Sequence, residues 1–335
     1  MQRGFMLSLP ARWLFSSLFF VCTLSLNLQI TQAETPTRGK KATAAPTKDW
    51  KSTLKNVAYG PHERNMLDLY LLDAEEPAPL IVCIHGGGFV AGSKEKIAPQ
   101  FLNAAREKGF SVASINYRFV TTDMFPAPQQ DGARAIQFLR CNASKYNLDE
   151  ERFAAFGGSA GAGISMWLAY HDDLANPLAD DPIARASSRV QAVGSIGGQS
   201  SYDPFVLKDW IGGKAYMHPS VFLCYRVLSI DQLSDPKLQP LYDEVSAIKH
   251  VSADDPPTFM YYSEPDQPLP ANSKPGEGIH HPIFGHKLKA ELDRAGIESE
   301  YYHASHAGRD WGTLLLDFFE QKMAATPQET AGQTQ

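Results

Sequence analysis

The chain has 335 residues, of which 43% are hydrophobic and 20% are charged, values that are ordinary for a globular protein with a sizeable core. This length suits one large α/β domain or two small ones. The formal net charge is −6 and no block of basic residues appears in the body of the chain, so the composition argues against nucleic acid as the main partner.

The first 33 residues are predicted to be a signal peptide and not part of the fold. Arg3 and Arg12 give a basic start, residues 13–26 are almost wholly apolar, and small residues at 31–33 suit cleavage. The alternative is a membrane anchor, but the apolar run is short for a membrane span. We therefore expect an exported protein, periplasmic or extracellular, that is not held at a membrane once the signal peptide is removed.

Three further regions follow the signal peptide. Residues 34–51 are rich in Thr, Ala, Pro and Lys and are predicted to be a flexible leader. A single domain is expected over 52–324, and the polar residues 325–335 are expected to form a tail. The sequence contains no internal repeat of the length used by solenoids or propellers.

The domain is predicted to begin with an antiparallel edge hairpin, because short strand patterns at 54–59 and 66–72 flank a polar turn. A buried-strand pattern at 80–84 then runs into His85-Gly86-Gly87-Gly88. A helix is expected over 94–108, since apolar residues recur there at helical spacing and a glycine follows.

A strand is next expected at 110–117 and a helix from Pro126, followed by a short apolar run at 153–156. That run leads into Gly157-Gly158-Ser159-Ala160-Gly161 and then into a helical pattern over 163–170. A serine at the tip of a tight turn between strand and helix is what a nucleophile elbow requires, with small neighbours that let the two elements approach closely. The alternative is a glycine-rich loop with an incidental serine.

The remaining elements continue the alternation of strands and helices. They are strands at 190–198, 258–262 and 298–302 and helices at 282–295 and 311–323. This alternation predicts a mainly parallel sheet with helices on both faces. Ligands of such sheets bind at the carboxyl ends of the strands. Both the loop at His85 and the turn at Ser159 follow such ends, which supports the two motifs independently.

At these motifs the chain resembles the serine esterases of the α/β-hydrolase superfamily. The branch it resembles carries a His-Gly-Gly-Gly motif and includes hormone-sensitive-lipase-like and acetyl-xylan or feruloyl esterase-like carboxylesterases. The resemblance runs over about residues 55–323 and implies the α/β-hydrolase fold. It also implies an oxyanion hole formed by the backbone N–H groups of Gly86, Gly87 and Ala160. The residues that support the two motifs are His85, Gly88, Gly157 and Gly161, with His85 orienting the glycine turn.

The resemblance further implies catalytic residues in the order Ser, Asp, His. The matching positions are Ser159 as nucleophile, Asp266 as acid and His306 as base. A serine hydroxyl must lose its proton to attack, an imidazole can accept that proton, and a carboxylate holds the imidazole in the right tautomer. Two alternatives stay open, namely Glu264 as the acid and His303 as the base.

Residues 202–250 are irregular and rich in aromatic side chains, and the resemblance implies that they form a small cap or lid over the pocket. These aromatic side chains either line an acyl or sugar site or form the core of the cap. His280 and His281 precede a predicted helix and are interpreted as part of its N-terminal region or as a pocket wall.

Neither a metal nor a cofactor is expected. No cluster of His, Cys and Asp has metal-ligand spacing in the sequence, and no phosphate-binding loop is present. Three cysteines follow the signal peptide, namely Cys83, Cys141 and Cys224. Cys83 lies mid-strand and is expected to be a buried free thiol, whereas a bridge between Cys141 and Cys224 is left open.

We expect an exported serine carboxylesterase that hydrolyses short-acyl esters through an acyl-enzyme intermediate. Its substrate would be a small-molecule or polysaccharide ester, with acetyl and feruloyl esters of polysaccharides as candidates. The alternatives are a peptidase or lipase of the same fold and a catalytically silent α/β-hydrolase used for binding. The oligomeric state is not predicted.

Overall fold

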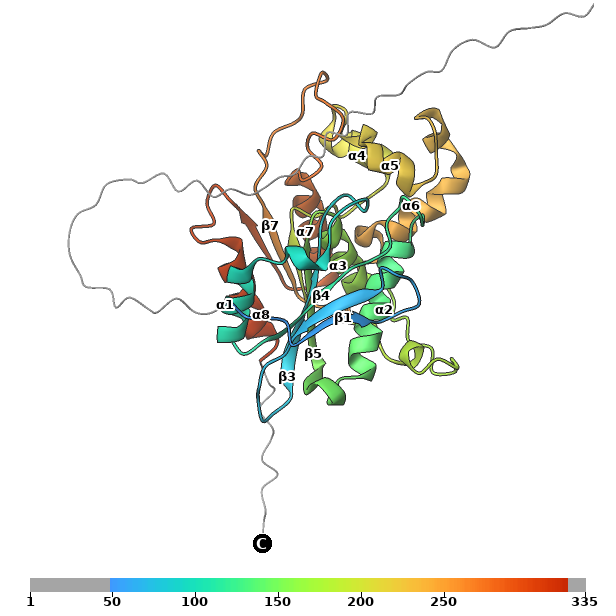
Figure 1. The fold of residues 1–335 in the computed structure, drawn as a ribbon. Coiled ribbons are helices and arrows are strands. Elements are labelled where there is room, and N and C mark those ends of the chain that lie inside the picture. Colours follow the sequence, from blue (N-terminus) through green and yellow to red (C-terminus); the bar gives the residue numbers. More distant parts are fainter. Residues whose placement is uncertain (1–48, 325–335) are drawn as a thin grey trace, which may run out of the picture. The chain divides into compact units, whose positions relative to one another are not determined.

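The computed structural model describes residues 49–324, which form an eight-stranded sheet with helices packed against it (Figure 1). The predicted signal peptide, the leader over 34–48 and the predicted tail lie outside the described residues. No helix within 49–324 has both the length and the apolar character that crossing a bilayer requires.

The sheet is mainly parallel. Its strands are β1 (Leu54–Ala58), β2 (Met66–Tyr70), β3 (Ala78–Ile84), β4 (Ser111–Ile115), β5 (Leu148–Gly158), β6 (Ala192–Ile196), β7 (Thr258–Tyr262) and β8 (Ser299–His303), in the spatial order β1-β2-β4-β3-β5-β6-β7-β8. β2 pairs antiparallel with β1 and β4, and all other neighbours pair parallel. The predicted fold class and the predicted edge hairpin are therefore confirmed.

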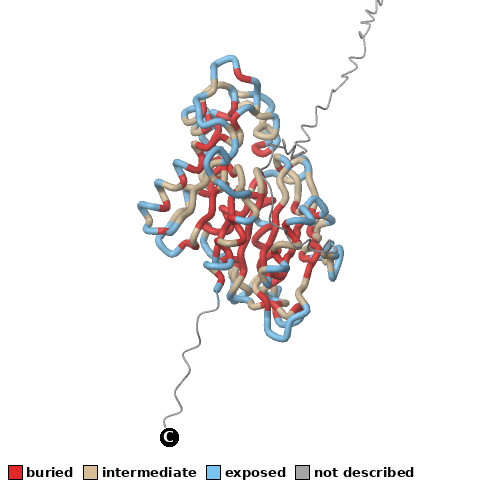
Figure 2. The backbone as a smooth tube through the Cα atoms, turned by 90° about the vertical axis from the view of Figure 1, so that its left-hand side faces the viewer, coloured by how far each residue is buried: buried red, intermediate tan, exposed pale blue. Residues whose placement is uncertain are grey.

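Helices cover both faces of this sheet. They are α1 (Pro99–Glu107), α2 (Ala127–Cys141), α3 (Ala160–Tyr170), α7 (Ile283–Ala295) and α8 (Trp311–Lys322). α1 and α8 pack together on one face, and α2, α3 and α7 lie on the other. Because the central strands are covered on both sides, they are buried along nearly their whole length, as the red tube in Figure 2 shows.

The helix predicted over 94–108 is interrupted. Lys94–Lys96 form a 3-10 turn and α1 begins only at Pro99. Ala98 is extended, with φ −70° and ψ 128°, because a proline ring disfavours helical backbone in the residue before it. Lys94 is buried instead, and its Nζ lies 2.8 Å from Asp68 Oδ1 of β2. The segment therefore fastens the loop after β3 to the sheet.

The insertion predicted at 202–250 lies between β6 and β7. It contains α4 (Pro204–Ile211), α5 (Pro219–Cys224) and α6 (Gln239–Val245), which gather beyond one end of the sheet in Figure 1. Tyr225 and Tyr242 belong to the same apolar cluster as α2, α3 and α7. These two tyrosines therefore join the core of the domain, whereas Phe205 of the insertion is exposed. The remaining 3-10 turns of the described chain are Ser144–Tyr146, Ile183–Arg185, Ala215–Met217, Asp231–Ser234, Pro236–Leu238 and Ala247–Lys249.

The three cysteines of the described residues are free. Cys83 is buried in β3, as predicted, and Cys224 is buried in α5. Cys141 is exposed at the end of α2. The bridge between Cys141 and Cys224 that the sequence left open is not formed.

Candidate active site

Ser159 occupies the turn between β5 and α3 in a backbone conformation that residues with a side chain rarely adopt. Its φ is 54° and its ψ is −121°. Its N–H donates to the carbonyl oxygen of Ile196 at 3.0 Å, which fixes the turn to the neighbouring strand β6. Strain at a serine between a strand and a helix is typical of a nucleophile elbow.

Two glycines let this turn pack closely against the neighbouring strand β3. A Cβ atom at Gly161 would overlap the carbonyl oxygen of Ile84 in β3, and a Cβ atom at Gly157 would lie 2.5 Å from the same oxygen. Side-chain atoms essentially never come so near a backbone oxygen. The Gly-x-Ser-x-Gly spacing is therefore a packing requirement of the turn.

A histidine and a glutamate complete a hydrogen-bonded series with this serine. His280 Nε2 lies 2.8 Å from Ser159 Oγ, and His280 Nδ1 lies 3.2 Å from Glu264 Oε1. All three side chains are partly exposed. Glu264 follows β7, and His280 lies just before α7. This is the arrangement of a serine nucleophile, an imidazole base and an orienting carboxylate.

The segment between Glu264 and His280 is held in place by the insertion. Leu269 N–H donates to Ile211 O at 3.3 Å, and Lys214 N–H donates to Ser273 Oγ at 3.0 Å. Gln199 of the loop after β6 donates from Nε2 to the carbonyl oxygen of Ile279, the residue before His280. The imidazole is thus positioned by contacts of the segment that leads up to it.

The predicted Ser159, Asp266 and His306 set is not brought together and is corrected by this geometry. His306 Nδ1 lies 2.8 Å from Ser305 Oγ on an exposed loop, and Asp266 Oδ2 pairs with His286 Nε2 at 2.7 Å. The alternative base His303 also does not contact Ser159. The alternative acid, Glu264, is the carboxylate that faces the imidazole.

His303 has a different place in the site. Its Nε2 lies 2.9 Å from the backbone carbonyl oxygen of Glu264 and donates to it. This bond joins the end of β8 to the segment that follows β7. His303 therefore holds the backbone of Glu264 in place and is not the base that contacts Ser159.

The topology places His280 at the same edge of the sheet as Ser159. The connection from β7 to β8 starts at the carboxyl edge of the sheet, so the N-terminus of α7 and the residues before it lie at the edge that carries Ser159. His280 lies three positions before Ile283, the first residue of that helix. The interpretation of His280 as a pocket wall placed it correctly, but the role of base was assigned to the loop after β8.

The glycine turn after β3 lies against the serine. A Cβ atom at Gly86 would lie 3.5 Å from Ser159 Cβ, and Gly87 has a φ of 123° that favours glycine. Within residues 49–324, the N–H groups of Gly86 and Gly87 donate no hydrogen bond. Ala160 is the first residue of α3, so its N–H has no partner inside the helix. Within the described residues, the three N–H groups predicted for an oxyanion hole are thus without a hydrogen-bond partner.

His85 holds the glycine turn in shape. Its Nδ1 lies 2.8 Å from the carbonyl oxygen of Gly86, and its ring stacks on Tyr117 with centroids 4.3 Å apart. Burial lowers the pKa of His85 to about 4, which keeps its ring neutral. These contacts agree with the predicted orienting role of His85.

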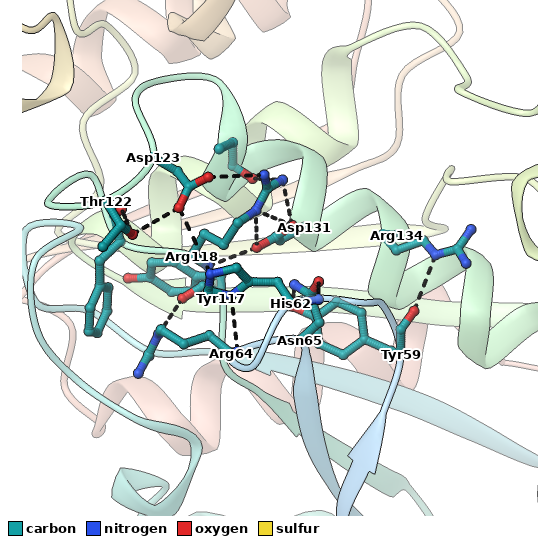
Figure 3. A network of polar contacts seen from close by, with 12 residues as sticks. Tyr59, His62, Arg64, Asn65, Tyr117, Arg118, Thr122, Asp123, Asp131 and Arg134 are labelled. Atoms are coloured by element: carbon teal, nitrogen blue, oxygen red, sulfur yellow. Dashed lines mark hydrogen bonds and ion pairs between the residues drawn. The ribbon is translucent and has the colours of Figure 1, made fainter.

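A polar network supports Tyr117 from the other side, as Figure 3 shows. Arg64 Nε donates to the carbonyl oxygen of Tyr117 at 2.7 Å, and the backbone N–H of Arg118 donates to Asp131 Oδ2 at 2.7 Å. The Tyr117 hydroxyl in turn donates to the carbonyl oxygen of His85 at 2.9 Å. The turn between β1 and β2 and the start of α2 thereby support the glycine turn.

A small apolar cavity of about 50 Å³ opens at Ser159. It is lined mainly by residues of the loops after β3 and β4 and of the insertion. The lining residues are Gly88, Phe89, Phe125, Ser159, Ala160, Gln199, Tyr202, Leu207, Ala215, His218, Ser220, Val221, Cys224, Tyr225 and Ile279. Since one water needs about 10–15 Å³, the cavity has room for a small group of non-hydrogen atoms beside Ser159.

His218 lies in the wall of this cavity. Burial lowers its pKa, and the nearby His280 acts in the same direction. Its Nδ1 lies 2.6 Å from Ser220 Oγ. A neutral His218 next to His280 places no positive charge against the imidazole that contacts the serine.

Comparison with protein families gives one matching model, the BD-FAE family, over residues 67–274. The matched residues include Ser159 and Glu264 and stop before His280.

Curated relatives carry esterase names. The chain is 29% identical over 225 residues to the "probable carboxylic ester hydrolase LipM" of Mycobacterium tuberculosis, covering 66% of this chain and 50% of the relative. It is 27% identical over 230 residues to esterase LipQ of the same organism, covering 68% and 52%. The chain thus spans about half the length of the curated relatives it matches.

Solved structures share the fold. An acetyl ester-xyloside bifunctional hydrolase from Caldicellulosiruptor lactoaceticus matches with a TM-score of 0.61 and 23% identity, over 76% of this chain and 87% of its own. A truncated carbohydrate esterase from gut microbiota matches with a TM-score of 0.61 and 22% identity, over 84% of this chain and 99% of its own. At these identities the likeness concerns the fold.

Proposed function

Because the chain belongs to the BD-FAE family, we propose that it is a carboxylic ester hydrolase with Ser159 as its nucleophile. The observation that carries this proposal is the 2.8 Å contact between Ser159 Oγ and His280 Nε2. An unassisted hydroxyl is a poor nucleophile at neutral pH, and an imidazole at this distance can take its proton as the oxygen attacks. Glu264 then holds the ring in the required tautomer and stabilises the imidazolium.

The reaction proceeds through an acyl-enzyme intermediate. Attack by Ser159 Oγ gives a tetrahedral oxyanion, which the N–H groups of Gly86, Gly87 and Ala160 receive. His280 returns the proton to the leaving alcohol, and the ester of Ser159 forms. A water molecule, deprotonated by His280, then attacks this ester. The bond to Ser159 Oγ breaks, His280 returns the proton to that oxygen, and the acid is released. Each oxyanion donor lowers the barrier by about 3–4 kcal/mol in comparable sites.

We propose short acyl groups, acetyl above all, as the substrates of this site. The cavity of about 50 Å³ at Ser159 suits an acyl group of a few non-hydrogen atoms, such as acetyl. Two structural neighbours are described as an acetyl ester-xyloside hydrolase and as a carbohydrate esterase. Acetylated polysaccharides are therefore the first polymers to test.

We further propose that the protein is exported. The basis is the basic start, the apolar run over 13–26 and the small residues at 31–33. Expression in a bacterial host followed by mass measurement of the protein outside the cytoplasm tests this. The expected mass lacks residues 1–33, and recovery of only the full-length chain in the cytoplasm contradicts export.

The central experiment measures hydrolysis of p-nitrophenyl acetate by the wild type and by Ser159→Ala, His280→Ala and His306→Ala. We expect Ser159→Ala and His280→Ala each to lower kcat by about 10³-fold or more, because each removes the activated nucleophile. His306→Ala serves as the matched control, since its side chain lies on an exposed loop away from the serine. It should retain kcat within about threefold.

The outcomes separate the alternatives. No hydrolysis by the wild type would favour a catalytically silent binding protein. A large loss in His306→Ala with activity kept in His280→Ala would restore the assignment made from the sequence. Esters of rising acyl length, assayed with the wild type, then test the expected preference for acetyl. A stable adduct of a phosphonate ester on the peptide that contains Ser159 would support the covalent route.

A further inference from the structure

A group of metal-binding side chains lies at the far end of α3 from Ser159. His171, Glu244 and His250 each offer one ligand atom, and these atoms all lie within 4.8 Å of one another. His171 directly follows α3, Glu244 lies in α6, and His250 follows the 3-10 turn at 247–249. The group is separated from Ser159 by about 16 Å of helix, given a rise of 1.5 Å per residue. It therefore plays no part in the ester chemistry.

The hydrogen bonds of the two imidazoles leave one nitrogen of each ring available. His171 Nδ1 lies 2.9 Å from the carbonyl oxygen of Asp172, and His250 Nε2 lies 2.7 Å from the carbonyl oxygen of Glu244. A carbonyl only accepts, so these nitrogens carry the hydrogens. The other nitrogen of each neutral ring then holds a lone pair. Histidines that ligate metals usually donate their second N–H to a carbonyl or carboxylate in this way.

The available nitrogen of His171 faces a carboxylate. His171 Nε2 lies 3.4 Å from Glu244 Oε1. With bonds of about 2.0–2.1 Å, two ligands of a tetrahedral zinc ion are separated by roughly 3.4 Å. Two acceptors at this separation repel each other unless a cation lies between them, and that cation is either a proton on His171 or a metal ion.

We propose that His171, Glu244 and His250 bind one zinc ion that links α3 to the insertion. Two imidazoles and a carboxylate are a ligand set that zinc favours, whereas magnesium and calcium favour oxygen ligands alone. Water would fill a fourth position. The backbone around the group is already fixed, because Trp167 Nε1 donates to the carbonyl oxygen of Glu244 at 2.8 Å. Ordering the ligands for the metal therefore requires little movement of the chain.

The sequence could not suggest this group. Its members are separated by 73 and 6 positions, so no short motif joins them. Their meeting depends on the path of the insertion across the end of α3. The group takes its carboxylate from α6 and not from the acidic loop that follows His171 in the chain.

The experiment is a calorimetric titration of zinc into the full chain, without a polyhistidine tag and after chelator treatment. We expect one zinc ion per chain and a thermal unfolding midpoint that rises with zinc concentration, since the metal binds the folded state. Magnesium should give neither effect. His250→Ala and Glu244→Gln should each weaken zinc binding by at least about tenfold.

Two features of the design make the result decisive. Glu244→Gln keeps the side-chain shape and leaves the backbone bond from Trp167 in place, so circular dichroism should show an unchanged fold. His306→Ala is the control, because the rings of His303 and His306 lie 5.5 Å apart and form a rival pair. Absence of zinc binding by the wild type, unchanged affinity in both ligand variants, or loss of binding in His306→Ala would overturn the proposal.

Discussion

Glu264 and Asp266 are two residues apart, yet their carboxylates face different histidines. Glu264 Oε1 lies 3.2 Å from His280 Nδ1, and Asp266 Oδ2 lies 2.7 Å from His286 Nε2. Only the first of these histidines contacts the serine. The two carboxylates therefore allow a comparison between one that orients a base and one that contacts a histidine at the surface.

Glu264→Gln is expected to lower kcat for p-nitrophenyl acetate by about 10²–10⁴-fold, because an amide does not stabilise the imidazolium and can favour the wrong tautomer. Asp266→Asn removes a half-exposed pair worth at most about 1 kcal/mol of stability. It should leave kcat within about threefold. Steady-state kinetics of both variants check this, and a larger loss in Asp266→Asn would contradict the assignment of the acid.

His85 makes folding stability depend on pH. Burial lowers its pKa in the folded protein to about 4, from an ordinary value near 6.5. As the pH falls below 6.5, His85 binds a proton in the unfolded chain but stays unprotonated in the folded chain. The free energy of unfolding is therefore unaffected by the titration of His85 above about pH 6.5 and decreases as the pH falls from 6.5 to 4.

The expected size follows from the same two pKa values. Between pH 7.5 and pH 5, protonation of His85 in the unfolded chain should lower the free energy of unfolding of the wild type by about 2 kcal/mol. Urea unfolding of the wild type and of His85→Gln at both pH values measures this, because the variant keeps the other titrating groups. The decrease in the free energy of unfolding between the two pH values should be smaller in His85→Gln than in the wild type by about the same 2 kcal/mol. Equal losses in both proteins would show that His85 is not held neutral.

At the scale of elements, the approach of α3 to β3 limits the choice of residue at Gly161. An alanine in a helix is normally more stable than a glycine by about 1 kcal/mol. At Gly161 the added Cβ atom would overlap the backbone carbonyl oxygen of Ile84, and backbone cannot move aside as a flexible side chain can. The overlap should outweigh the gain in helix propensity.

We expect Gly161→Ala to lower the free energy of unfolding by about 3 kcal/mol or more, with loss of activity as the elbow shifts. Gly109→Ala is the comparison. Gly109 follows α1 with a φ of 80°, and an added Cβ atom there would meet open space, so only its backbone strain of about 1–2 kcal/mol applies. Urea unfolding of both variants measures the difference. A smaller loss in Gly161→Ala than in Gly109→Ala would mean that α3 can move away from β3.

At the scale of the whole molecule, the parts of the fold that the sequence predicted are those with local signals. The alternating strands and helices, the edge hairpin and the elbow at Ser159 all follow from periodicity and from glycines in tight turns. The break at Ala98 could also have been read locally, because Pro99 constrains the residue before it.

The base of the candidate site was not predicted because its position depends on a long segment. Residues 264–280 are held near Ser159 in part by contacts with Ile211, Lys214 and Gln199, which lie at least 50 positions away in the sequence. Nothing local distinguishes His280 from His303 or His306. The order of residues along the chain, Ser then acid then His, was correct for the set that the structure brings together.

The insertion and the sheet share one apolar cluster, and this bears on how the molecule unfolds. The ring of Phe125, which precedes α2, lies 5.6 Å from Tyr202 and 5.7 Å from Tyr225, and Tyr225 lies 4.7 Å from Tyr242. The Tyr225 hydroxyl also donates to the carbonyl oxygen of Tyr202 at 2.7 Å. These contacts give the insertion little apolar core of its own, so we expect it to unfold together with the sheet.

Tyr225→Ala tests this expectation. Truncating a buried aromatic side chain to alanine lowers the free energy of unfolding by about 3–5 kcal/mol. If the insertion and the sheet form one cooperative unit, the variant lowers the urea midpoint equally in far-ultraviolet circular dichroism, which follows helices and strands, and in near-ultraviolet dichroism, which follows aromatic packing. An insertion that unfolds separately would lose its near-ultraviolet signal at lower urea while the far-ultraviolet signal stays near that of the wild type. Because His280 depends on contacts with the insertion, activity would then disappear with the first of the two transitions.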